Sequence, residues 1–90
     1  MHDVIDNREL KRFELQERGQ VAWADYEVRG DRVILPHVEA PIGLRGSGAA
    51  GRLMEGLMSI IRERGLKVTP VCSYAVTWIE RHPECADLCA

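Results

Sequence analysis

The residues most able to do chemistry lie in a glycine-rich segment between an extended stretch and an amphipathic one. Residues 43–51 read Gly-Leu-Arg-Gly-Ser-Gly-Ala-Ala-Gly. Glycines let the main chain adopt unusual conformations and let a ligand approach it closely. The first N–H groups of a helix lack internal partners and carry partial positive charge, so the segment is expected to hold a phosphate group. The candidate binding residues are Leu44, Arg45, Gly46, Ser47, Gly48, Ala49, Ala50 and Gly51. On the glycines alone, a tight loop with close helix packing is the simpler interpretation.

Two familiar nucleotide motifs match this segment by spacing but fail on their other requirements. Gly43 and Gly48 have the spacing of a phosphate-binding P-loop, yet alanines stand where its lysine and hydroxyl residue belong. Gly46, Gly48 and Gly51 match the glycine pattern of a dinucleotide site. That pattern requires an acidic residue at the end of the next strand and further strand–helix units, for which the chain has no room. Nucleotide hydrolysis and dinucleotide binding are therefore both disfavoured.

Three side chains are candidates for proton transfer or nucleophilic attack. His37 and Glu39 are two residues apart on an expected strand, so they lie on the same side of it. An imidazole suits proton transfer at neutral pH. The alternative is that His37 is a hydrogen-bonded partner in a half-buried strand and Glu39 a structural tie to the loop. Cys72 is expected just before a helix, where N–H groups can lower the pKa of a thiol and make it nucleophilic. A small buried packing residue is the alternative for Cys72.

The elements that position these residues follow from hydrophobic periodicity. After a loose lead-in over residues 1–9, we expect strands over residues 10–16, 21–28 and 32–39, a helix that starts after Ser47 and stops at Gly65, a strand over residues 67–72, and a helix over residues 74–81 capped by Ser73. Pro36 lacks an N–H, so it should interrupt pairing or sit at a bulge. The fold class is α/β (α+β), with order β-β-β-α-β-α: an antiparallel meander plus one parallel, right-handed βαβ crossover.

Length and composition limit the class of protein. Ninety residues, with 46% hydrophobic and 29% charged, are expected to form one compact domain over residues 1–90. A net charge of −2 gives no footprint for nucleic acid, and no apolar run is long enough to cross a membrane. The start lacks signal-peptide regions, and three cysteines make a poor disulfide framework, so a cytoplasmic location is expected. No metal site is expected, because His82, Cys85 and Cys89 lack a convincing fourth ligand.

The glycine-rich segment also resembles a third motif. Arg45-x-x-Gly48-x-Ala50 is similar to the (Q/R)-x-x-G-x-(G/A) motif of the GNAT superfamily of acetyl-CoA-dependent N-acetyltransferases. The chain further resembles a subfamily of very small GNAT-like proteins through His37-x-Glu39-x-Pro41, Pro70-Val71-Cys72 and His82-Pro83-Glu84. The resemblance covers residues 10–88, nearly the whole chain.

The resemblance implies a cofactor, a reaction and further site residues. In that family the motif's backbone amides bind the pyrophosphate of acetyl-CoA, and the third and fourth expected strands splay apart around the pantetheine arm. A backbone N–H near Val38 or Glu39 would face the thioester oxygen. Tyr74 is similar in position to a tyrosine that protonates the leaving sulfur in many members. The acetyl group would pass to an amine by direct attack or through Cys72.

The chain also departs from the family, whose ordinary members are longer and begin with two helices that wall the acceptor site. The acceptor side is therefore expected to be open, or to be completed by a partner or a second copy, in a monomer or weak homodimer. The acceptor amine is not identified by the sequence. Two other interpretations remain: a non-catalytic acyl-CoA-binding module, and a small interaction domain without a cofactor.

Overall fold

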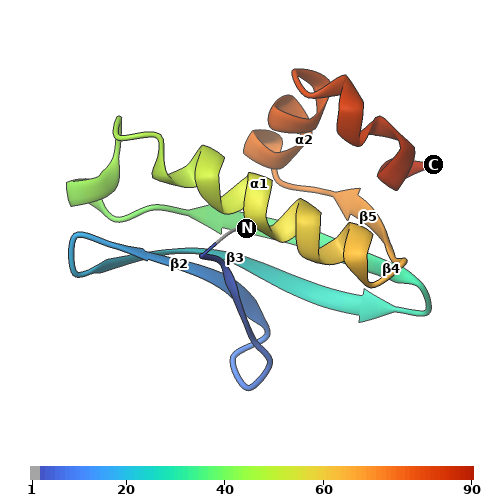
Figure 1. The fold of residues 1–90 in the computed structure, drawn as a ribbon, viewed down its shortest axis with the longest axis horizontal. Helices are drawn as coiled ribbons and strands as arrows, with labels where there is room; N and C mark the ends of the chain where they lie inside the picture. Colours follow the sequence, from blue (N-terminus) through green and yellow to red (C-terminus); the bar gives the residue numbers. More distant parts are fainter. Residues whose placement is uncertain (1–2) are drawn as a thin grey trace.

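The computed structural model describes residues 3–90 as a five-stranded mixed sheet with its helices packed on one face (Figure 1). In chain order the elements are β1 (Ile5–Asn7), β2 (Arg12–Glu17), β3 (Gln20–Arg29), β4 (Arg32–Glu39), the 3-10 helix η1 (Ile42–Leu44), α1 (Ala49–Glu63), β5 (Lys67–Pro70), α2 (Ser73–Glu80) and the 3-10 helix η2 (Pro83–Cys89). The strand order in the sheet is β1-β2-β3-β4-β5. Neighbours among β1 to β4 are antiparallel, and β5 runs parallel to β4. The mixed α/β class, the meander and the single parallel crossover are confirmed.

Alternation along the strands puts the core on one face of the sheet. Phe13 and Leu15 of β2 and Ala22, Ala24 and Tyr26 of β3 are buried, while the residues between them are half-buried. The buried side of α1 meets this face: Ala49, Leu53, Met54, Gly56, Leu57, Met58, Ile60 and Ile61 are buried. In Figure 1, α2 and η2 lie beside α1, beyond β5. We call the other side the open face, because none of the helices over residues 3–90 packs on it.

The bulge expected at Pro36 is present. Across β3 and β4, Glu27 pairs with Ile34 but Asp25 pairs with His37, so two residues of β4 oppose Tyr26 alone. Proline has no N–H to donate to the neighbouring strand, and a residue at a bulge is left unpaired and does not need one. The bulge shifts the alternation of β4, so Val38 packs toward the core while Pro36 and His37 are exposed.

Two expectations about the elements are wrong. The lead-in over residues 1–9 is not loose where the structure describes it: residues 5–7 form β1, and Val4 is buried in the core. Met1 and His2, which also belong to that expectation, lie outside the described residues. Ser73 does not cap α2, because Cys72 is the N-cap residue and no side chain bonds the cap. The tail after α2 forms η2, which Arg62 holds by bonding the Asp87 carboxylate at 2.9 and 3.0 Å.

Candidate functional site

The glycine-rich segment forms a turn that leads into α1, as its spacing predicts. Gly46 and Gly48 have φ angles of +79° and +87°, and Gly48 is the N-cap residue of α1. These are left-handed conformations that glycine adopts at little energetic cost and other residues avoid. The left-handed backbone conformation therefore accounts for glycine at these two positions. The Ser47 hydroxyl closes the turn by donating to the Leu44 carbonyl at 2.6 Å.

The backbone amides of this segment divide into two sets. Four donate within the protein: Leu44, Arg45 and Ser47 to carbonyls of preceding residues, and Ala49 to the Ser47 hydroxyl at 3.3 Å. Four have no acceptor among residues 3–90: Gly46, Gly48, Ala50 and Gly51. A helix start normally satisfies such groups with a side chain, water or a ligand. The unpaired amides give this turn the capacity to bind an anion, and we call them the cradle amides.

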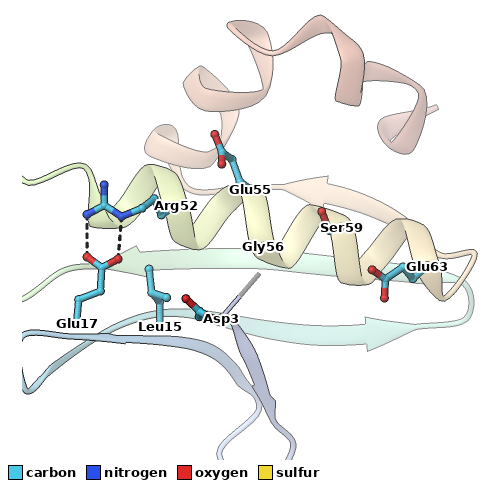
Figure 2. Close-up of a pocket in the computed structure, with 8 residues that line it drawn as sticks. All are labelled: Asp3, Leu15, Glu17, Arg52, Glu55, Gly56, Ser59 and Glu63. Atoms are coloured by element: carbon cyan, nitrogen blue, oxygen red, sulfur yellow. Dashed lines mark hydrogen bonds and ion pairs between the residues drawn. The ribbon is translucent and has the colours of Figure 1, made fainter. Parts of the chain in front are cut away.

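Arg52 braces the turn from the first part of α1, a role the sequence did not reveal. Its guanidinium makes two hydrogen bonds of 2.7 Å to the Glu17 carboxylate (Figure 2). It also donates one of 3.1 Å to the Ser47 carbonyl. The hydrogen bonds from Arg52 lower the pKa of Glu17, against a smaller opposing effect of desolvation. Because Glu17 ends β2 and is 35 residues away in sequence, only the folded sheet brings the pair together.

The β2–β3 turn touches the same loop at a second place. A β-carbon on Gly43 would lie 2.1 Å from the side-chain nitrogen of Gln20. Gln20 begins β3, directly after the turn that follows Glu17. Glu17 and Gln20 therefore approach the glycine turn from one hairpin, and they fix its position relative to the sheet.

The strands on either side of the crossover separate beyond Leu35. Pairing of β4 with β5 runs from Arg32 opposite Lys67 to Leu35 opposite Pro70. The amides of Val71 and Cys72 both donate to the Leu35 carbonyl, at 3.0 and 3.2 Å, and the chain then turns into α2. β4 continues to Glu39, paired only with β3 among the described residues. Beyond Leu35, the edge of β4 that contains Val38 is therefore not paired by β5, as expected for strands that splay, and we call the place where this pairing stops the gap.

His37 and Glu39 do come together, on the open face. His37 Nε2 lies 3.0 Å from Glu39 Oε2, and the second Glu39 oxygen accepts a hydrogen bond from Arg45 at 3.4 Å. Arg45 also donates to the Ala40 carbonyl at 3.2 Å, so its side chain joins the glycine turn to the end of β4. The His37 side chain is 51% exposed and that of Glu39 34%. The pair can exchange a proton with a group that approaches over the open face.

Cys72 and Tyr74 form a second group, on the side of the helices. Cys72 is half-buried against the core, and its carbonyl accepts the Val76 amide as N-cap of α2. Burial raises the pKa of Tyr74, and negative charge on Cys72 raises it further. A methyl group on Gly51 would lie 4.0 Å from the Tyr74 hydroxyl, so this hydroxyl reaches the first turn of α1. No hydrogen bond links this group to His37 or Glu39 within residues 3–90.

The hollows found in the surface lie away from the cradle amides. Figure 2 shows one of about 620 Å³ beside α1, lined by acidic side chains and Arg52. A second, of about 520 Å³, is lined by Tyr26 and Arg64, and a third, of about 660 Å³, by Trp78 and Cys85. Within residues 3–90, no cluster of three or more His, Cys, Asp or Glu side chains could hold a metal ion, and no helix is long and apolar enough to span a membrane.

Comparison with known proteins identifies a family and a solved structure to which the chain is similar. The family of GCN5-related N-acetyltransferases matches residues 12–88. The NMR solution structure of a GCN5-like protein from Staphylococcus aureus superposes with a TM-score of 0.66 at 22% sequence identity, covering 98% of this chain and 89% of that one. No functionally curated protein matches the chain. The similarity to the solved structure supports the fold alone. Because the family match spans most of the sequence, the chain belongs to the GCN5-related N-acetyltransferase family.

Proposed function

We propose that this protein binds acetyl-CoA and transfers the acetyl group to an amine. The observation that carries the proposal is the set of four cradle amides without a protein acceptor, at Gly46, Gly48, Ala50 and Gly51. A helix N-terminus with unpaired N–H groups stabilises phosphate by hydrogen bonds and by the helix dipole. The pyrophosphate of CoA is an anion of this kind, and the family uses acetyl-CoA as its donor.

The gap between β4 and β5 gives the rest of the cofactor a path. With its pyrophosphate on the turn, the pantetheine arm extends along the edge of β4 that β5 does not pair. Its amides take the place of the missing strand, and the thioester reaches Val38 and Glu39. A backbone N–H there stabilises the oxyanion that develops on the thioester carbonyl during attack.

The two groups of side chains suit the two proton transfers of the reaction, one from the amine to a base and one from an acid to the leaving thiolate. The amine must lose a proton before its nitrogen attacks the carbonyl carbon, and the His37–Glu39 pair is the base that receives it. As the carbon–sulfur bond breaks, the CoA thiolate takes a proton, and Tyr74 is the acid that gives it. The raised pKa of Tyr74 keeps its hydroxyl protonated at neutral pH. The products are the acetylated amine and free CoA.

Cys72 offers a second route, because it lies on the same side as Tyr74. In this route its thiolate takes the acetyl group from CoA, and the amine then attacks the cysteine thioester. Direct transfer is the route we favour, since no hydrogen bond joins Cys72 to a base among residues 3–90. The three free cysteines suit a reducing compartment, and we propose the cytoplasm. The proposed assembly remains a monomer or weak homodimer.

Cofactor binding is tested by placing a negative charge on the cradle. Ala50→Asp adds a carboxylate to the first turn of α1, where acidic residues stabilise a helix but repel a bound phosphate. We expect calorimetry to show acetyl-CoA binding weakened roughly tenfold, about 1.4 kcal/mol, with no loss of folding stability. Ser59→Asp makes the same change about 13 Å along the same helix and is the matched control. Equal affinity in all three proteins would place the cofactor elsewhere.

Catalysis is tested by release of free CoA from acetyl-CoA with a mixture of amines. Turnover that survives Cys72→Ala excludes an obligatory acetyl-cysteine. Binding of acetyl-CoA without turnover of any amine favours the non-catalytic acyl-CoA module. Absence of binding in the wild-type protein contradicts the proposal and leaves a small domain without this cofactor.

A further inference from the structure

We propose that Asp25 determines acceptor specificity by binding a second ammonium group, so that the acceptor is a short aliphatic diamine or a polyamine that approaches over the open face. This inference rests on the proposed acetyl transfer. Asp25 lies on β3, directly opposite His37 of β4, and Trp23 lies opposite Glu39. Residues directly opposite on antiparallel strands point to the same face of the sheet. The Asp25 carboxylate is therefore the nearest acidic group on β3 to the proposed base.

Donor and acceptor must approach this base from different sides. The cradle amides open α1, and Cys72 packs against the core, so the cofactor occupies the side of the helices. His37 and Glu39 project to the other side, because Trp23 and Asp25 alternate with the buried residues Ala22, Ala24 and Tyr26. The gap beyond Leu35 connects the two sides. An amine that attacks the thioester through this gap must therefore come across the open face.

Asp25 is available for such an amine, whereas its neighbours are paired. Arg12 is the cross-strand partner of Asp25 on β2, but its guanidinium bonds Glu14 at 2.5 Å and lies 5.2 Å from the Trp23 ring centre. Glu39 is shared by His37 and Arg45. The Asp25 carboxylate has no hydrogen bond or ion pair among residues 3–90. A half-exposed carboxylate without a cation, next to the base, favours a positively charged ligand.

The spacing of the strands sets the size of the acceptor. Neighbouring strands lie about 5 Å apart, so Asp25 stands one strand spacing from His37 and farther from the gap. The reacting nitrogen sits at the gap, beyond the reach of Asp25. A second ammonium group three or four methylenes away can reach Asp25 while the first nitrogen is at His37. A monoamine of the same length cannot use Asp25.

The kinetic test compares 1,4-diaminobutane with butylamine. For wild type we expect a lower KM with the diamine than with the monoamine. Asp25→Asn should raise the KM for the diamine roughly threefold to fivefold, as for an exposed ion pair, and leave its kcat and the butylamine kinetics unchanged. Glu27→Gln is the control, because Glu27 is on the same strand and face but pairs with Arg29. Equal KM values for the two amines in wild type, or a diamine KM unchanged in Asp25→Asn, would overturn the inference.

A binding test separates this inference from the proposed activity. Titration with 1,4-diaminobutane should shift the NMR signals of the Trp23 indole N–H and of the Asp25 and His37 amides, and these shifts should be lost in Asp25→Asn. Butylamine should produce much smaller shifts. If no amine is acetylated but the diamine shifts persist, the transferase proposal fails while the cation site stands. If amines are acetylated and the diamine leaves these signals unchanged, the site is wrong and the transferase proposal stands. If neither occurs, both fail.

Discussion

Substitutions of the glycines in the turn before α1 are expected to have different effects, because these glycines have different roles in the structure. Gly48 caps α1 with φ +87°. An alanine in the left-handed region costs about 1–2 kcal/mol. Its β-carbon would also lie 2.9 Å from the nearest guanidinium nitrogen of Arg52, which must shift away. We expect Gly48→Ala to destabilise the fold by about 1–2 kcal/mol, lowering the Tm by roughly 4–16 °C in a domain of this size.

Two neighbouring glycines supply matched controls. Gly46 has φ +79° but open space around its α-carbon, so Gly46→Ala carries the backbone strain without disturbing Arg52. Gly51 has an ordinary helical φ, and a methyl group there would meet Trp78 at 3.8 Å, a normal contact distance. Gly51→Ala should therefore stabilise the protein by up to about 1 kcal/mol, because alanine favours a helix over glycine. The expected order of stability is Gly51→Ala, wild type, Gly46→Ala, Gly48→Ala.

Urea unfolding followed by circular dichroism measures the three differences, and calorimetry of acetyl-CoA measures their effect on binding. Gly48→Ala should weaken binding more than Gly46→Ala, because moving Arg52 releases the Ser47 carbonyl and with it the turn. A Gly48→Ala protein as stable as wild type would refute the left-handed cap. Equal losses of affinity at Gly46 and Gly48 would refute the role of Arg52.

Further predictions concern the brace and the core. Glu17→Gln should weaken acetyl-CoA binding severalfold in calorimetry by loosening Arg52, and the effect should shrink at high salt. Leu57→Ala should destabilise the fold by about 2–5 kcal/mol in urea unfolding, because Leu57 is fully buried. Tyr26→Phe should cost about 2 kcal/mol by the same measurement, since the Tyr26 hydroxyl donates to the buried Asp6 carboxylate at 2.6 Å. Burial and the Asp6 bond raise the pKa of Tyr26 to about 12, so its stabilisation is complete below pH 10 and is lost as the pH rises through 12. Burial acts to raise the pKa of Asp6, but bonds from Tyr26 and Arg64 outweigh it and lower the pKa below 3.8. Unfolding followed from pH 5 to pH 2 should therefore show this contribution present above about pH 4 and lost as the pH falls through the folded pKa.

Local sequence signals predicted the parts of the fold that depend on local chemistry. The strand over residues 32–39 has the predicted bounds, because alternation and the turn before it are both local. α1 ends at Glu63, just before the stop expected at Gly65, whose φ is +69°. The glycine motif predicted where the helix would begin. The irregular pairing at Pro36 was predicted because proline lacks a backbone N–H.

The features that were missed depend on residues far apart in the chain. β1 is three residues long and polar, and its place comes from pairing with β2 and from Asp6, which bonds Tyr26 and Arg64. Arg52 has the exposure of an ordinary surface residue until Glu17 is brought to it. The partners in the contacts of Asp6 with Tyr26 and of Arg52 with Glu17 are 20 or more residues apart, so no local pattern could have paired them. The conformation of the glycine turn depends on neighbouring residues and could be predicted from the sequence. The contact of Arg52 with Glu17, which supports the turn, could not.

The exposure of His37 and Glu39 constrains how the proposed catalysis could work. Ion pairs in contact with water are weak, and a base that water reaches freely gives little electrostatic advantage. The open face therefore leaves the reaction inefficient until something covers it. A bound acceptor does this itself if it spans from the gap to Asp25, because its carbon chain displaces water from His37 while its second charge is held on β3. The acceptor would then shield the proposed base itself, which links the proposed selectivity for a dication to the exposure of His37 and Glu39.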